Sequence, residues 1–189
     1  QTFLKAMGVW SEYADCRSSA AFRPEALEEF ESILCRAIED SSGKAAEQIK
    51  AYAEGQNAAL AFREIQQIFG DVFICAGYWL GQLHGLERNL RDQSPRLQAV
   101  FDQQPDIEAL MTRLERILHE LWLSEFVWES IEVFAPIYDL ICDRMAQQGM
   151  VFVRHEEEWR IVMCEDPEAV DEARKALERW TKPSEQTDD

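Results

Sequence analysis

The sequence has few basic residues and few histidines, and it lacks the short motifs of common catalytic and nucleotide-binding sites. Only 19 lysines and arginines accompany 36 aspartates and glutamates, so the formal net charge is -17. This balance argues against direct binding of DNA, RNA or an anionic membrane, and it favours a basic partner. High net charge also maintains solubility on its own, which is the simpler interpretation. No GxSxG, P-loop, GxGxxG or HExxH pattern is present, so no motif argues for an enzyme.

Cysteines are few, odd in number and scattered, at Cys16, Cys35, Cys75, Cys142 and Cys164. No CxxC pair and no cysteine and histidine cluster of the zinc type occurs. We therefore expect free, buried thiols in a reducing cytoplasm, and no bound metal or cofactor. The N-terminal sequence lacks the basic start, the apolar run and the cleavage site of a secretory signal. Because the sequence opens on Gln1 rather than Met, both a whole protein and a piece of a longer one stay open as interpretations.

Apolar residues recur at spacings of three and four along most of the chain, which predicts a mainly α-helical protein. Prolines and caps divide this pattern into predicted helices at 3–20, 24–40, 44–69, 94–104, 107–134 and 137–148. The sequence SSG at 41–43 is the predicted stop of the second helix. With the apolar, glycine-rich stretch at 71–91, these segments predict a bundle of about six to seven helices over residues 1–148.

After Gly149 the apolar pattern changes from a helical period to alternation. The alternating apolar residues are Val151, Val153, Trp159, Ile161 and Met163. This pattern predicts a β-hairpin. Asp166 followed by Pro167 is a helix start, so an amphipathic helix is expected to follow the hairpin. We expect residues 149–181 to pack on the bundle as an appendage, and residues 182–189 to form a disordered tail.

Three glycines, Gly77, Gly81 and Gly85, recur every four residues and therefore share one face of a predicted helix. Each costs about 1 kcal/mol relative to alanine inside a helix, so a compensating contact is expected. Small residues at every fourth position allow the backbone of another helix to approach closely. The simplest interpretation is a close crossing within the chain. A homodimer seam and a groove for a ligand or peptide are the alternatives.

The predicted helix at 107–134 carries an acidic series beside two tryptophans. Glu125, Glu129 and Glu132 fall along one edge at spacings of four and three, next to Trp122 and Trp128. Aromatic anchors mixed with carboxylates suit the binding of a basic, partly apolar helix or peptide. In the simpler interpretation, the tryptophans belong to the core and the glutamates to the solvated face.

Two histidine and carboxylate pairs stand at helical spacing, His84 with Glu87 and Glu115 with His119. Di-iron bundles place a glutamate three residues before a histidine on each of two helices. One pair here has the reverse order and the other is spaced by four, so no metal site is predicted. If the two pairs converge, they would line a pocket for a small ligand.

Three hypotheses of function follow. The first is a non-catalytic protein interaction domain, of the adaptor, inhibitor or chaperone-like kind, that binds a basic protein or peptide through an acidic surface. The second is a helical enzyme, or a protein that binds a metal or small ligand, with its site near the glycine-rich helix. The third is a structural or assembly domain of a longer chain.

Overall fold

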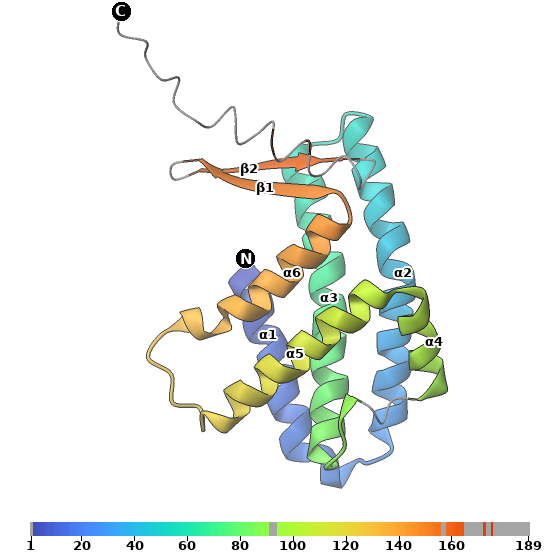
Figure 1. The fold of residues 1–189 in the computed structure, drawn as a ribbon, viewed down its shortest axis with the longest axis vertical. Coiled ribbons are helices and arrows are strands. Elements are labelled where there is room, and N and C mark those ends of the chain that lie inside the picture. Colours follow the sequence, from blue (N-terminus) through green and yellow to red (C-terminus); the bar gives the residue numbers. More distant parts are fainter. Residues whose placement is uncertain (1, 91–93, 156–157, 165–171, 173–174, 176–189) are drawn as a thin grey trace, which may run out of the picture.

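The protein is mainly helical, which confirms the predicted class. The structure, a computed structural model, describes residues 2–90, 94–155, 158–164, 172 and 175. Its α-helices in these ranges are α1 (Thr2–Ser19), α2 (Ala26–Ala53), α3 (Ala58–Gly85), α4 (Pro95–Gln103), α5 (Pro105–Leu123) and α6 (Ala135–Gln147) (Figure 1). Among the described residues, η1 (Ala20–Phe22) and η3 (Ile131–Phe134) are short 3-10 helices, and β1 (Met150–His155) and β2 (Glu158–Met163) are strands.

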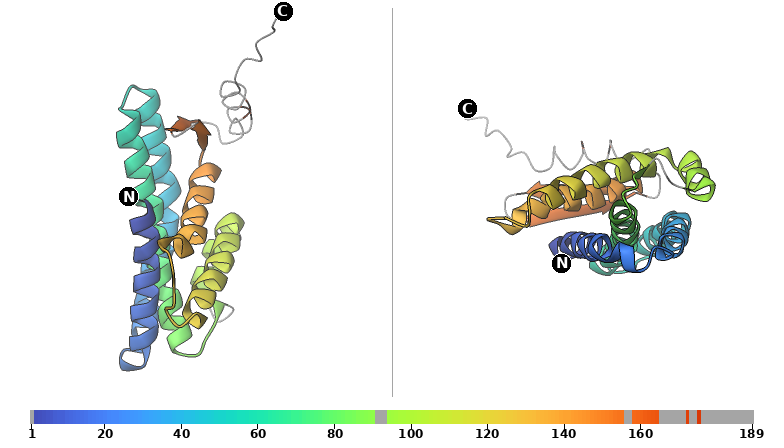
Figure 2. Two further views of the ribbon diagram at one scale, coloured as in Figure 1. Left: turned by 90° about the vertical axis from the view of Figure 1, so that its left-hand side faces the viewer. Right: turned by 90° about the horizontal axis from the view of Figure 1, so that it is seen from below.

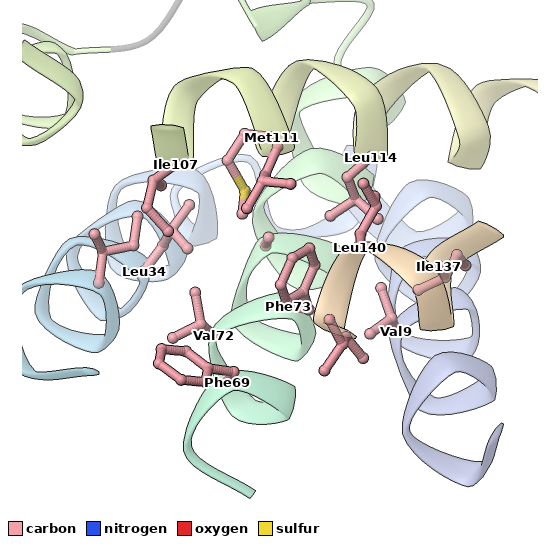
Figure 3. Packing of buried hydrophobic residues seen from close by; sticks show 14 of the residues in the cluster. Val9, Leu34, Phe69, Val72, Phe73, Ile107, Met111, Leu114, Ile137 and Leu140 are labelled. Carbon is pink, nitrogen blue, oxygen red and sulfur yellow. The ribbon is translucent and has the colours of Figure 1, made fainter. Parts of the chain in front are cut away.

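The helices form two layers. In the first layer, α3 lies between α1 and α2 and packs along both of them. The second layer contains α5, α6 and the two strands, and it covers one side of the first layer (Figure 2). Between the layers, Phe69 and Phe73 of α3 belong to the same buried core cluster as Met111 of α5 and Leu140 of α6 (Figure 3). All four side chains are buried, and burial of each contributes about 1.5–3 kcal/mol relative to exposure.

The predicted break at 41–43 is wrong, because α2 continues through it to Ala53. Ser41 is buried there, and its hydroxyl donates to the Ile38 carbonyl at 2.9 Å, so the helix accommodates it. The helix instead ends before Gly55, whose φ of 107° suits glycine. Asn57 then caps α3 by accepting hydrogen bonds from the backbone N–H groups of the second and third residues after it. From this cap, α3 runs without interruption through the glycine-rich stretch.

The predicted helix at 107–134 is too long, because α5 ends at Leu123. Glu125 and Phe126 adopt left-handed backbone conformations, with φ of 53° and 64°, which a continuous helix does not allow. The Ser124 hydroxyl fixes the turn, because it accepts the Trp128 indole N–H at 2.7 Å. The three glutamates of the predicted acidic edge are therefore spread over a loop and the 3-10 helix η3.

The strands β1 and β2 pair antiparallel, with Met150 opposite Met163. Both of these methionines are buried in the hydrophobic core cluster. The predicted helix from Pro167 and the predicted tail at 182–189 lie outside the described residues, apart from positions 172 and 175, which are helical. None of the helices in the described part of the chain is long and apolar enough to cross a membrane.

Candidate functional site

The three glycines of α3 lie directly against the backbone of α1. A Cβ atom on any of them would fall within 3.0 Å of an α1 carbonyl oxygen, that of Val9 for Gly77, Tyr13 for Gly81 and Arg17 for Gly85. The glycine face is therefore covered by α1 of the same chain. This close approach also brings the side chains of α1 beside those at the C-terminal end of α3 and on α5.

A first candidate site is a groove of about 630 Å³ between α1 and the loop that follows α5. We call it the aromatic groove, because Trp10, Phe126, Trp128 and Phe134 line it. The Trp10 ring meets the Trp128 ring edge-on at a centroid distance of 5.3 Å, and Trp128 meets Phe134 at 5.2 Å. Edge-to-face pairs at these distances stabilise each other beyond the burial of their surface. The loop is thus held on α1 by aromatic contacts rather than by a continuing helix.

The rim of the aromatic groove combines exposed apolar side chains with carboxylates. Phe126 is 52% exposed and Ile131 is 51% exposed, and both line the groove. Val127 lies between Phe126 and Trp128 in the loop and is 80% exposed. Asp15 and Glu129 also line the groove, and they are the only charged residues among its described lining. Large apolar side chains exposed together on a surface commonly mark an interaction site.

The structure separates the five residues predicted to bind a partner. Trp128 and Glu129 line the aromatic groove, whereas Trp122 packs beside it, 6.5 Å from Trp10 between ring centroids. Glu125 and Glu132 are exposed in the same segment and add carboxylates near the groove without lining it. The single helical edge that the sequence predicted does not exist, because α5 ends before Glu125.

A second candidate site is built on a chain of hydrogen bonds from α1 through α3 to α5. The Arg17 guanidinium donates to the Tyr13 hydroxyl oxygen. The Tyr13 oxygen lies 2.8 Å from His84 Nδ1, and His84 Nε2 lies 3.1 Å from Glu115 Oε1. The same oxygen of Glu115 accepts the backbone N–H of Leu90 at 2.9 Å.

The donors and acceptors of this chain occupy both ring nitrogens of His84. A carboxylate can only accept, so His84 Nε2 carries the proton that it shares with Glu115. The Tyr13 oxygen already accepts from Arg17, so its own proton is available to His84 Nδ1. Both ring nitrogens of His84 are therefore held by hydrogen bonds, Nδ1 by Tyr13 and Nε2 by Glu115.

Burial and hydrogen bonding set the ionisation of the two flanking groups. Burial would raise the pKa of the Glu115 carboxyl, but hydrogen bonds from His84 and the Leu90 N–H outweigh it and hold the pKa below the ordinary value. Burial raises the pKa of Tyr13 to about 12, against the opposing effect of Arg17. At neutral pH, Glu115 is therefore a carboxylate and Tyr13 a neutral hydroxyl.

These groups open onto a pocket of about 590 Å³ between the ends of α1 and α3 and one face of α5. His84, Glu87, Glu115 and His119 all line it, so the two histidine and carboxylate pairs converge. The rings of His84 and His119 meet edge-on with centroids 5.9 Å apart. We call this site the histidine–arginine pocket, because its remaining lining includes Arg17, Arg88, Arg113 and Arg116.

Sequence reasoning missed the arginines of this pocket. Two of them, Arg113 and Arg116, stand three residues apart on α5 and therefore share a face of that helix. This spacing was visible beside Glu115 and His119 in the sequence. The contribution of Arg17 was not visible, because it depends on the crossing of α1 over α3. Within the described residues, no group of three or more histidine, cysteine, aspartate or glutamate side chains is arranged to hold a metal ion.

Comparison with known proteins gives no relative from which to transfer a function. No protein-family model, curated protein or solved structure matches this chain. Function is therefore inferred from the chemistry of the aromatic groove and of the histidine–arginine pocket.

Proposed function

We propose that the chain is a non-catalytic interaction domain that binds a basic, amphipathic helix or peptide of a partner protein in the aromatic groove. The observation that carries the proposal is the composition of the groove. Exposed apolar side chains surround an aromatic floor, and the only charged residues among the described lining are the carboxylates Asp15 and Glu129.

The apolar part of the groove supplies the attraction. Covering Phe126 and Ile131 removes the exposed halves of two large side chains from water, and each is worth about half of the 1.5–3 kcal/mol of a complete burial. Trp10 and Trp128 beneath them are held by ring contacts, so little side-chain freedom is lost on binding. Tryptophans in such positions are the usual anchors of a protein interface. An amphipathic helix binds in a groove of this kind through its own apolar residues, which recur at spacings of three and four along one face of that helix.

The carboxylates determine which kind of partner is favoured. Glu125 and Glu132 are exposed in the same segment as Glu129, and the whole chain carries a net charge of -17. This field attracts a basic segment and repels an acidic one, and it accelerates association at low ionic strength. The partner is therefore expected to carry lysines or arginines beside its apolar residues.

The test uses a fluorescent peptide in which leucines at positions i, i+3, i+4 and i+7 form one face and lysines the other. We expect saturable binding, followed by anisotropy, that weakens as salt is added. Glu129→Lys should weaken it about tenfold at low salt, because an attractive and a repulsive surface pair each contribute up to about 1 kcal/mol. Ile131→Ser should weaken it by a similar or larger factor.

Two matched variants control this experiment. Glu47→Lys makes the same charge reversal at an exposed site of α2, and Leu60→Ser removes an apolar side chain that is 38% exposed on α3. Both should bind the peptide as the unchanged protein does. If Glu129→Lys binds no more weakly than Glu47→Lys, or Ile131→Ser no more weakly than Leu60→Ser, the groove is not the binding site.

The proposal includes the finer organisation and setting of the chain. Residues 149–181 would form an appendage of hairpin and amphipathic helix on the bundle, and burial of Met150 and Met163 in the core cluster supports its contact with the helices. No disulfide joins Cys16, Cys35, Cys75 and Cys142 in the described part of the chain, which supports a reducing, cytoplasmic setting.

A further inference from the structure

We propose that the histidine–arginine pocket binds a small organic anion, and that Arg17 and Arg116 hold its carboxylate or phosphate group. This site is separate from the aromatic groove, and it gives the chain a ligand of low molecular weight in addition to a protein partner. The inference rests on the distribution of charge, on the fixed position of Arg17 and on the size of the pocket.

The charge of the pocket is opposite to that of the chain. Acidic residues outnumber basic ones almost two to one overall, with 36 against 19. The described lining of the pocket reverses this ratio, with four arginines and two glutamates. One glutamate, Glu115, directs its charge at His84 and the backbone N–H of Leu90. A local excess of positive charge in so acidic a protein favours an anionic ligand.

Two of the arginines keep their charge available. Arg113 forms an ion pair with Asp143 at 2.8 Å, so its charge is compensated. None of the ion pairs among the described residues includes Arg17 or Arg116. Each guanidinium has five N–H donors in a planar fork, which matches the geometry of a carboxylate or a phosphate.

Arg17 is held in place before any ligand arrives. Its guanidinium donates to the Tyr13 hydroxyl, and its central carbon lies 4.5 Å from the centre of the Trp122 ring. Both partners are neutral, so they orient the guanidinium without neutralising it. An arginine side chain that is already ordered loses less conformational entropy on binding, and this raises its affinity for an anion.

The dimensions and the remaining polar groups suit a metabolite-sized ligand. Pockets for such ligands measure about 300–1,000 Å³, and this one measures about 590 Å³. Arg17 lies on α1 and Arg116 on α5, so an anion bound to both arginines would connect the two layers of helices. His119 lies three residues after Arg116 on the same helix and lines the same pocket, where its ring offers a further polar contact.

The test follows the three histidines by nuclear magnetic resonance, with inorganic phosphate and citrate as separate probes. The chain has only three, and His155 belongs to β1 rather than to α1, α3 or α5, so it serves as an internal reference. His119→Gln and His155→Gln assign the signals. At constant pH, with sodium chloride matched for ionic strength, the signals of His84 and His119 should shift to saturation while that of His155 stays in place. The probe with the tighter saturation identifies the anionic group.

Arg116→Gln should weaken binding of the preferred probe about tenfold, the size expected for the loss of one charge-assisted hydrogen bond. Arg36→Gln makes the same change at an exposed site of α2 and should leave binding unchanged. The proposal is refuted by shifts that sodium chloride reproduces, by shifts that do not saturate, or by equal affinities in the two variants. Glu129→Lys should bind the anion normally, so failure of this site and failure of the aromatic groove are distinguishable.

Discussion

Replacing Gly81 by alanine adds one methyl group at the closest approach of α1 and α3. The new Cβ would overlap the carbonyl oxygen of Tyr13 and lie 3.0 Å from the Cβ of Cys16. Backbone atoms cannot rotate away, so the two helices must separate. Overpacking of this kind costs about 1–3 kcal/mol, and a rigid obstacle places Gly81 at the upper end of that range. Alanine recovers about 1 kcal/mol of helix propensity, which leaves a net destabilisation of about 2 kcal/mol.

Gly43→Ala is the matched control, because it makes the same chemical change in the middle of α2. A Cβ at Gly43 would meet no atom within 4 Å, and the residue is helical. Only the propensity term remains there, so this variant should gain about 1 kcal/mol. The two substitutions are thus expected to have opposite signs.

Urea denaturation followed by far-ultraviolet circular dichroism measures both variants, and equal slopes would show that the free energies are comparable. For a chain of this length, 1 kcal/mol corresponds to about 2–4 °C in the melting temperature. Gly81→Ala should therefore melt lower than the unchanged protein and Gly43→Ala higher. A Gly81→Ala variant as stable as Gly43→Ala would show that α1 does not lie against this glycine.

Two further predictions concern buried polar groups. Hydrogen bonds lower the pKa of Glu115 in the folded state, so they stabilise the fold fully at pH values above the unfolded-state pKa of this carboxyl. This stabilisation is lost as the pH falls through the lower, folded-state pKa. The stability of Glu115→Gln should therefore decrease less on acidification than that of the unchanged protein. Arg144 is buried and donates to Ser42 at 2.9 Å and to Gln104 at 3.0 Å. Arg144→Ala should lower the free energy of unfolding, measured by urea denaturation, by about 2 kcal/mol, because it leaves these acceptors unpaired. Arg144→Met should lower it less, since methionine fills the volume without a buried charge. Equal losses in the two variants would contradict this reasoning.

The continuity of α2 could have been predicted from its apolar spacing. Leu34, Ile38, Ser41, Ala45 and Ile49 are buried at steps of three and four that stay in phase across the serine–glycine sequence. A glycine inside a helix costs only about 1 kcal/mol, which is less than the burial of one of these large apolar side chains contributes. The serines and the glycine are therefore a weaker signal for the end of this helix than the phase of its apolar stripe.

The end of α5 could not have been predicted in the same way. The residues after Leu123 keep a helical apolar period, and no proline intervenes before Pro136. The chain leaves the helix because Trp128 packs on Trp10 of α1, more than a hundred positions earlier in the sequence. Contacts of this kind override local pattern, and they cannot be deduced from spacing along one segment.

The candidate sites show the same division. Spacing alone identified His84, Glu87, Glu115 and His119, and each pair lies within one stretch of chain. Their convergence depends on which faces of α3 and α5 meet, and the positive charge of the pocket also depends on Arg17, which α1 supplies. The helical period specifies which residues share a face of one helix, but it does not specify which neighbouring helix that face packs against.

The glycines of α3 lie directly against the main chain of α1. The atoms that hold α1 in place are therefore different from the side chains of α1 that face a ligand. On the α1 side, the glycines touch carbonyl oxygens, which every residue type provides equally. Asp15 and Arg17, which face the groove and the pocket, can therefore be exchanged for other residues while the crossing of the helices persists. Over evolutionary time, the side chains of α1 that face a ligand or partner are therefore free to change. Selection that keeps α1 in its place acts instead on the three glycines of α3.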